Sequence, residues 1–365
     1  MPHRKLPVQL LLVALPLILL LGMVGCGEDA TAPRFGEVII EVFPDSLPIP
    51  WTLVSGKAMY SGVGDTTLSS LSPGDYELTW GGLLGYVLPN PPRETETVAA
   101  GEAIVFHTVY TEFTLGDFVA INAGSFTMGA PPGDSVAFAD ERPPHPVTIS
   151  RPFWLKSTEV TQAEYGAIMC ENPSYWQGCD DCPVERVNWN SALLFCNTLS
   201  DWAGLAPAYT ITPDTVVWDR NAPGYRLASE AEWEYACRAG SSSRFYAGDH
   251  DSILAGIGWY AGNARGFPHR VGEKSPNDWG LYDMHGNVFE LCWDWFASYD
   301  DGGVTDPAGP ATGLFRISRG GGYQFDPDRC TATARGLSSP SETSQQRGLR
   351  IARNDQPKHH PREEQ

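Results

Sequence analysis

The sequence predicts an α+β protein in which a small all-β sandwich is followed by a larger, irregular and loop-rich domain. The 38 glycines and 30 prolines among 365 residues favour turns and short elements over long helices. Short runs of alternating polar and apolar residues between 36 and 112 are typical of strands, and only a few later segments have helical spacing. Hydrophobic residues make up 42% of the chain, enough to build a buried core. We therefore expect an all-β domain over 36–112 and a mixed domain over 117–354.

Residues 1–25 are typical of a signal peptide. A basic start at His3–Lys5 is followed by an apolar stretch over Val8–Leu21, which is too short and wrongly flanked for a membrane span. The small residue before Cys26 resembles a bacterial lipobox, which implies that Cys26 is diacylated and becomes the mature N-terminus. A plain secretory signal with a cysteine at this place by chance is the alternative. Because no Asp follows Cys26, we expect an extracytoplasmic protein, lipid-anchored in the outer membrane of a Gram-negative bacterium.

A short polar tether is expected at 26–35, before the predicted sandwich. Strands are expected at 37–42, 76–80 and 103–109, separated by Pro, Gly, Asn and Asp. This segment resembles surface β-domains of the PEGA type, and an immunoglobulin-like spacer explains the pattern equally well. It offers no residues with an evident chemical role.

The larger domain contains three segments that favour helices. Thr158 or Thr161 is suited to cap a short helix, because a hydroxyl can accept from the free N–H groups of the first turn. Residues 192–197 have apolar side chains at helical spacing. In 226–238, Ser229 and the glutamate three residues later form the pattern of a capping box. A polar tail over 355–365 closes the chain.

The formal net charge of −19 argues against a nucleic-acid partner. A phosphate backbone would be repelled by such a chain, whereas many acidic proteins bind other ligands. The charge therefore excludes one class of partner and selects no other.

Seven cysteines follow Cys26, so at least one thiol stays unpaired or bonds to another molecule. An exported location permits disulfides. The Cys-X-X-Cys pair at 179 and 182 lacks the second pair that zinc requires, so two local disulfides are the expected outcome. Their pairing and the state of Cys292 stay open; the candidates are Cys170, Cys179, Cys182 and Cys196.

Several blocks of the larger segment resemble the formylglycine-generating-enzyme, or sulfatase-modifying-factor, family. They occur in the family's order and cover about 117–354; they read GSFTMG, ERPPHPV, TEVTQAEY, RLASEAEWEYACRAG, SPNDWGLYDMHGNVFEL, SRGGGYQ and QRGLRIAR. The resemblance implies a compact C-type-lectin-like fold with little regular secondary structure. It also implies an activity, because the enzymes oxidise a sulfatase cysteine with copper held by two thiolates.

Phe325 and Cys330 stand where the family has its two copper-binding thiols. A phenyl ring cannot coordinate a metal, so copper and formylglycine generation are not expected here. In the family the cysteine matching Cys237 forms a disulfide, which implies a Cys237–Cys330 bridge. The resemblance then implies a non-catalytic binding or accessory module for a carbohydrate or protein ligand. The alternative is an oxidoreductase of the same superfamily that uses a different site.

The resemblance also implies a calcium site. Asp283, Gly286, Val288 and Glu290 match calcium-binding positions of the family, two through side chains and two through backbone carbonyls. The alternative is that Asp283 and Glu290 pair with nearby arginines or face solvent.

A ligand pocket is expected from aromatic and basic residues of the larger domain. Phe289, Trp293, Arg319 and Arg335 are the candidates, and Trp279 and Trp295 belong to the same aromatic set. Aromatic faces stack on sugars, but they also fill cores. Arginines clamp anions, but they also bond to backbone carbonyls and acids.

Overall fold

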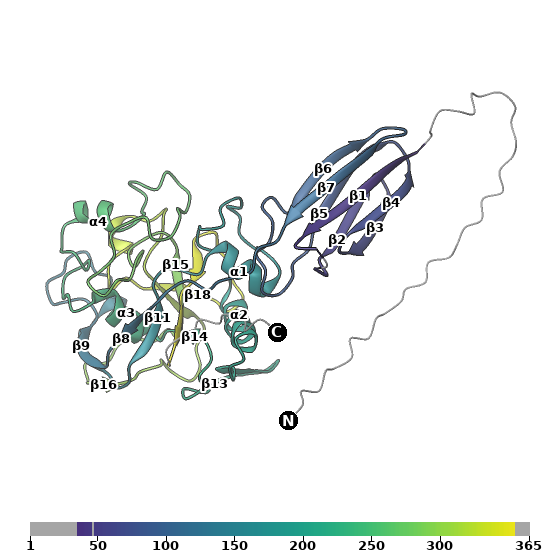
Figure 1. Cartoon of the computed structure of the whole chain (residues 1–365). Helices are drawn as coiled ribbons and strands as arrows, with labels where there is room; N and C mark the ends of the chain where they lie inside the picture. The colour runs from purple at the N-terminus through teal and green to yellow at the C-terminus, as the bar shows by residue number, and fades with distance from the viewer. Residues whose placement is uncertain (1–34, 46, 355–365) are drawn as a thin grey trace, which may run out of the picture.

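The computed structural model describes residues 35–45 and 47–354. The expected signal peptide, Cys26, almost all of the tether and the polar tail lie outside these residues. Figure 1 shows a β-sandwich in purple to blue beside a larger body in teal to yellow. The predicted α+β class, with an all-β part first, is confirmed. Among the described helices, none is both long and apolar enough to cross a membrane.

The N-terminal body is a sandwich of two sheets with strand orders β4-β1-β7 and β3-β2-β5-β6. Alternate residues of β1, including Val38 and Ile40, are fully buried and pack with Trp51 and Leu53 from the facing sheet. The alternation predicted for β1, β5 and β7 thus places one face of each of these strands in a core. The strands are β1 Gly36–Phe43, β2 Pro50–Ser55, β3 Ala58–Val63, β4 Thr66–Leu71, β5 Gly74–Trp80, β6 Arg93–Val98 and β7 Ala103–Val109.

The larger body contains short strands in four small sheets, ordered β16-β10-β9, β14-β20-β11-β8, β12-β13 and β18-β17-β15-β19. Long irregular segments connect them, as the glycine and proline content predicts. The strands are β8 Phe118–Ile121, β9 Gly124–Met128, β10 His145–Ile149, β11 Phe153–Lys156, β12 Tyr209–Ile211, β13 Val216–Trp218, β14 Arg226–Leu227, β15 Phe289–Trp295, β16 Val304–Thr305, β17 Arg316–Arg319, β18 Gly336–Ser338, β19 Arg347–Leu349 and β20 Ile351–Arg353.

The helices begin where local capping allows. Thr161, and not Thr158, caps α1, and its hydroxyl accepts from the Glu164 amide while Glu164 accepts in return. Ser229 and Glu232 form the same reciprocal pair at the start of α3, so the predicted capping box is confirmed. The helices are α1 Gln162–Met169, α2 Trp189–Trp202, α3 Glu230–Arg238 and α4 Asp251–Ile257, with single turns at η1 Ala139–Glu141 and η2 Pro327–Arg329.

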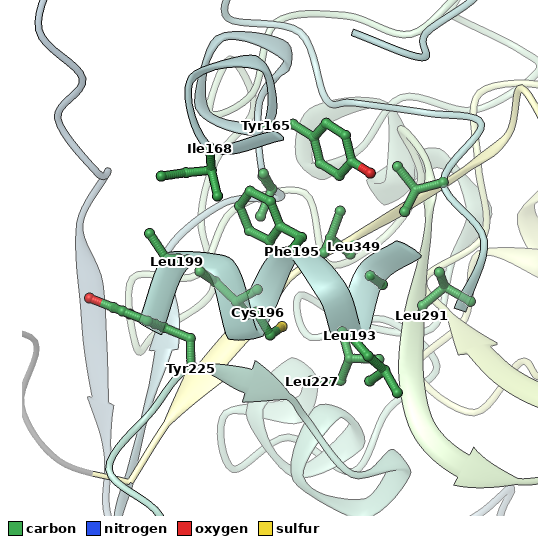
Figure 2. Close-up of a cluster of buried hydrophobic side chains, with 14 of the residues drawn as sticks. Tyr165, Ile168, Leu193, Phe195, Cys196, Leu199, Tyr225, Leu227, Leu291 and Leu349 are labelled. Carbon is green, nitrogen blue, oxygen red and sulfur yellow. The ribbon is translucent and has the colours of Figure 1, made fainter. Parts of the chain in front are cut away.

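One hydrophobic cluster joins α1 and α2 to the strands behind them (Figure 2). Tyr165 of α1 stacks on Phe195 of α2, with ring centroids 5.2 Å apart. Leu193 and Leu199 of α2 are fully buried in the same cluster, together with Leu349 of β19. Burying such side chains is worth about 1.5–3 kcal/mol each, so this cluster fixes the two helices against the strands.

The two bodies contact each other at α1. The Gly85 amide donates to the Ala167 carbonyl of that helix at 2.8 Å. The Asn90 side chain donates to Asp180 at 2.9 Å. Phe113, just after the sandwich, is buried in the core of the larger body. The segment that links the two bodies is therefore hydrogen-bonded to the larger body and partly buried.

Candidate functional site

The residue expected at the position of the first family thiol, Phe325, makes an aromatic packing contact. Phe325 is half-buried, and its ring meets the edge of Phe289 with centroids 5.1 Å apart. The second position, Cys330, is 0% exposed, and burial raises the pKa of its thiol to about 12. A buried thiol of this kind stays protonated at neutral pH. The two positions together offer apolar surface and one neutral thiol.

The expected Cys237–Cys330 disulfide is absent, and both residues carry free thiols. The imidazole of His285 connects them instead. Its Nε2 lies 3.7 Å from the Cys237 Sγ and its Nδ1 lies 2.7 Å from the Cys330 carbonyl oxygen. Burial lowers the pKa of His285 to about 3, so the ring is neutral; Nδ1–H donates to Cys330 and Nε2 accepts from the Tyr246 amide. The expectation of a bridge at this place is therefore wrong.

One of the two expected local disulfides is present, between Cys179 and Cys182. Cys170 is an exposed free thiol at the end of α1, and Cys196 is buried in the hydrophobic cluster around α2. Cys292 is free and buried in β15. The second local bridge is therefore not formed.

Two of the expected pocket arginines are held by carboxylates of α3. Arg319 is 0% exposed and pairs with Glu234 and with Glu230, the latter at 3.2 Å. Arg335 makes two bonds of 2.8 Å to Glu230, and it also donates to the carbonyls of Asp140 and Ala297. Paired acids satisfy these buried charges. Arg319 and Arg335 thus form buried ion pairs in the core, and the expectation that they face a ligand is wrong.

The expected calcium residues form a buried acidic group around Arg350. Both oxygens of Glu290 are in use: Arg350 donates to them at 2.7 and 2.8 Å, and Trp233 donates at 2.6 Å. Asp283 accepts from the Gly272 amide through Oδ2, while its Oδ1 is buried without a partner. Burial raises the pKa of Asp283 to about 6.

Glu159 lies in the same group and was not foreseen from the sequence. It is 0% exposed, and neither of its carboxyl oxygens has a hydrogen-bond partner. Burial first, and then the charge of Asp283, raise the pKa of Glu159 well above its ordinary value. Within the ranges that the structure describes, no three His, Cys, Asp or Glu side chains are arranged to hold a metal ion.

A cavity of about 520 Å³ lies on the larger body, away from the thiol positions. Trp189 of α2 and the half-buried Trp293 and Trp295 of β15 form its floor, together with Arg316 of β17. Its walls are the turn between β12 and β13 and residues 308–312. Trp293 is thus the expected pocket residue that does line a cavity. Phe289 packs against Phe325, and Trp279 packs edge-on against Tyr235 at 5.0 Å.

The guanidinium of Arg316 lies between two indoles. Its central carbon is 3.5 Å from the ring centroids of both Trp189 and Trp295. The side chain donates through Nη1 to the Trp293 carbonyl. Burial lowers the pKa of Arg316 to about 9, although Asp294 opposes this shift. No local sequence signal marks this arrangement, because its members come from three segments between 189 and 316.

Comparison with known proteins assigns most of the chain to one family. The profile of the sulfatase-modifying factor enzyme 1-like domain matches residues 105–355. "Chaperone protein LppX" of Paenibacillus barcinonensis is 30% identical over 269 residues, which cover 65% of this chain and 89% of that protein. The formylglycine-generating enzyme of Streptomyces coelicolor is 28% identical over 302 residues, covering 64% and 88%.

A solved structure supports the same assignment. Treponema denticola variable protein 1 superposes with a TM-score of 0.62 at 32% sequence identity, covering 67% of this chain and 98% of that one. The profile match spans more than half of the chain, and it includes the thiol positions, the acidic group and the tryptophan-lined cavity. The chain belongs to the family of the sulfatase-modifying factor enzyme 1-like domain.

Proposed function

We propose that this protein is an exported, non-catalytic binding or accessory module that recognises a carbohydrate or protein ligand. The main support for this proposal comes from the two positions where the family is expected to have its thiols. Phe325 packs on Phe289, and Cys330 is buried and protonated. Cu(I) is held by thiolates, and two of them are needed to make a tight site. A site with one neutral thiol and a phenyl ring lacks this chemistry.

The names of the relatives agree with a division of roles in the family. One relative is named as a chaperone and another as a formylglycine-generating enzyme. The family fold therefore does not determine the activity of a given member. The expected absence of the thiol pair supports the accessory role that we propose for this chain.

The test is a conversion assay on the full-length protein with a cysteine-containing sulfatase peptide, Cu(I) and oxygen. Mass spectrometry of the peptide reports formylglycine, and an active formylglycine-generating enzyme serves as positive control. We expect no conversion by the wild type or by Phe325→Cys, because Gly322 also departs from the serine of the enzymes. Conversion by the wild type would overturn the proposal and favour an oxidoreductase with a different site.

We also propose that Cys26 carries the lipid anchor. The basic start, the apolar run and the small residue before Cys26 support this. Cys26→Ala should leave the precursor unprocessed or release the protein from the membrane fraction, and it should abolish labelling with a fatty acid. Cys170→Ala removes an exposed free thiol and is the matched control. An acylated, membrane-bound Cys26→Ala protein would contradict the anchor.

A calcium ion near Asp283 is a further part of the proposal, with a changed set of side-chain ligands. Glu290 does not fit as a ligand, since Arg350 and Trp233 already donate to both of its oxygens. Asp283 and Glu159 do fit, because three of their buried oxygens lack partners. The carbonyls of Gly286 and Val288 would complete a set of oxygen ligands of the kind that calcium prefers.

Thermal unfolding in calcium and in chelator tests this site. A bound ion stabilises the folded state according to its concentration relative to the dissociation constant. We expect calcium to raise the wild-type Tm, and Asp283→Asn or Glu159→Gln to reduce that rise. Glu290→Gln should lower the Tm in both buffers alike, since it breaks an ion pair. Equal wild-type Tm values in calcium and chelator would exclude the site.

A further inference from the structure

We propose that the cavity between Trp293, Trp295 and Arg316 binds an acidic saccharide, a sugar that carries a carboxylate. This inference rests on the proposed binding role and names a site and a ligand class for it. The volume of about 520 Å³ lies within the range of small-molecule sites. Two features of the described residues carry the argument: a buried cation without an acid partner, and aromatic surface around it.

The first feature is the charge of Arg316. The side chain is 4% exposed, and no ion pair to it is found within the described ranges. Its Nε has no hydrogen-bond partner among the described residues, and its Nη1 donates to the Trp293 carbonyl. The donors of Nη2 are left for the cavity that Arg316 lines. A buried charge is costly unless it is paired, so this guanidinium is suited to a carboxylate brought by a ligand.

The acid next to Arg316 does not serve as its counter-ion at neutral pH. Burial, followed by the charge of Glu230, raises the pKa of Asp294 to about 8. The Asp294 Oδ2 accepts from the Glu230 amide at 2.7 Å, within the core and not in the cavity. At pH 7 Asp294 is therefore mostly neutral, and Arg316 keeps its full positive charge.

The second feature is the aromatic floor. Trp189 and Trp295 hold the guanidinium plane between them at 3.5 Å, which fixes the direction of its donors. Trp293 is stacked on Tyr209 at 5.3 Å and 5°, so its orientation is fixed as well. The C–H groups of a pyranose ring carry small positive partial charges and pack on the negative face of an indole. Trp293 and Trp295 both line the cavity and are half-buried. Tyr209 covers one face of Trp293 and Arg316 covers one face of Trp295, so the exposed remainder of each indole is the surface left for a sugar.

The walls can supply hydroxyl contacts. The turn between β12 and β13 contributes Thr212, Asp214 and Thr215, and the opposite wall contributes Thr312. Hydroxyl and carboxylate oxygens both bond to the hydroxyls of sugars. Asp214 lines the same cavity and repels a carboxylate, so the acid group of the ligand is expected at Arg316 and its hydroxyls at Asp214. The other described acidic residues behind the net charge of −19 do not line the cavity. Salt screens distant charges beyond about 8 Å at physiological ionic strength, while Arg316 acts at contact.

The experiment is isothermal titration of the full-length protein with short oligosaccharides that contain galacturonate, glucuronate, N-acetylmuramate or N-acetylneuraminate. Each has its methyl ester as a control, which keeps the ring and hydroxyls and removes the charge. We expect at least one acid to bind with a Kd below about 1 mM, and its ester to bind roughly tenfold more weakly or worse. Equal binding of acid and ester would overturn the proposal, as would no binding of any acid up to about 10 mM.

Variants locate the binding. Arg316→Met should remove the preference for the acid over its ester. Because this residue is buried, Ala311→Trp provides an independent test: Ala311 is exposed on the cavity wall, and an indole there would block the mouth. Trp279→Phe changes an indole outside the cavity and should bind as the wild type does. Saccharide affinity that is unchanged by both Arg316→Met and Ala311→Trp would refute the site.

The conversion assay separates this inference from the proposed function. If the sulfatase peptide is not converted and no acidic saccharide binds, the non-catalytic role stands and the cavity proposal fails. If the peptide is converted, the non-catalytic role fails whatever the saccharides do.

Discussion

Asp294 shows how burial sets the charge of a single residue. The carboxyl is buried beside Arg316, and the charged groups that shift its pKa include Glu230 and Glu232, which raise it, and Arg335, which lowers it. The net result is a pKa of about 8 against an ordinary value of 3.8. Between these two values the folded protein holds a proton that the unfolded chain releases. Asp294 therefore lowers the free energy of unfolding progressively as the pH rises from about 4 to 8.

The substitution Asp294→Asn removes this titration and keeps an oxygen that can accept from the Glu230 amide. We expect the Tm of the variant, relative to wild type, to be higher at pH 8 than at pH 5, by a few degrees. Scanning calorimetry at the two pH values measures this difference. A Tm difference that is the same at pH 5 and pH 8 would show that Asp294 is ionised throughout.

Some residues of the site can be predicted from the sequence, and others cannot. The placement of Phe325 at a family thiol position rests on the resemblance alone and stays a prediction. The resemblance failed for the Cys237–Cys330 bridge, since the ring of His285 connects the two residues instead. No sequence pattern marks Arg316, because the indoles that surround it are distant from it in the sequence. Local spacing is visible in a sequence, whereas the partners of a buried charge are not.

The helix α3 contributes two carboxylates to the interior of the larger body. Its first turn carries Glu230 and its second carries Glu234, and these carboxylates hold Arg335 and Arg319. The Ser229 cap fixes where this helix begins. The cap therefore sets the positions of two buried ion pairs as well as one hydrogen bond.

We expect Ser229→Ala to lower the free energy of unfolding by about 1–2 kcal/mol. The Glu232 amide loses its hydrogen-bond acceptor, and Glu230 and Glu234 are then held less firmly against their arginines. Urea denaturation followed by tryptophan fluorescence measures the change. Ser252→Ala, at an exposed position in α4, is the matched control and should be neutral. Equal stability of the two variants would show that the cap does not fix α3.

The elements differ in how far the sequence predicts them. The helix α3 was predicted with its cap, since the capping box and the apolar face lie within ten residues. Three strands of the sandwich, β1, β5 and β7, were predicted from alternation over five to seven residues. By contrast, β17, β19 and β20 have three or four residues each, all of them buried. Strands so short have no alternation to detect, and their pairing depends on distant segments.

At the scale of the whole molecule, the contact between the two bodies leaves no room for a side chain at Gly82. A Cβ there would come within 2.6 Å of the Cys170 carbonyl oxygen at the end of α1. The approach involves backbone, which cannot rotate away as a side chain can. This glycine therefore allows the sandwich to lie directly against the larger body.

We expect Gly82→Ala to loosen this contact and to lower stability by about 1–3 kcal/mol, because the backbone must shift to relieve the overlap. Limited proteolysis should then cut faster between 81 and 92, the segment that carries Gly85 and Asn90. Gly302→Ala is the control, since a Cβ at Gly302 meets no atom within 4 Å. Identical cleavage of both variants and the wild type would mean that the bodies do not need this close approach.

The strand order β14-β20-β11-β8 has a consequence for the time at which the protein can fold. The last described strand, β20, pairs with β11 and β14, which are synthesised about 200 and 125 residues earlier. Arg350, directly before it, is the ion-pair partner of Glu290 and also donates to the Lys156 carbonyl. A chain that is synthesised from its N-terminus therefore cannot complete this sheet, and cannot bury Glu290 with its ion-pair partner, until β20 has been made. The larger domain of such a chain therefore stays unfolded until synthesis is almost complete. A translocation pore that passes only unfolded chains requires this state.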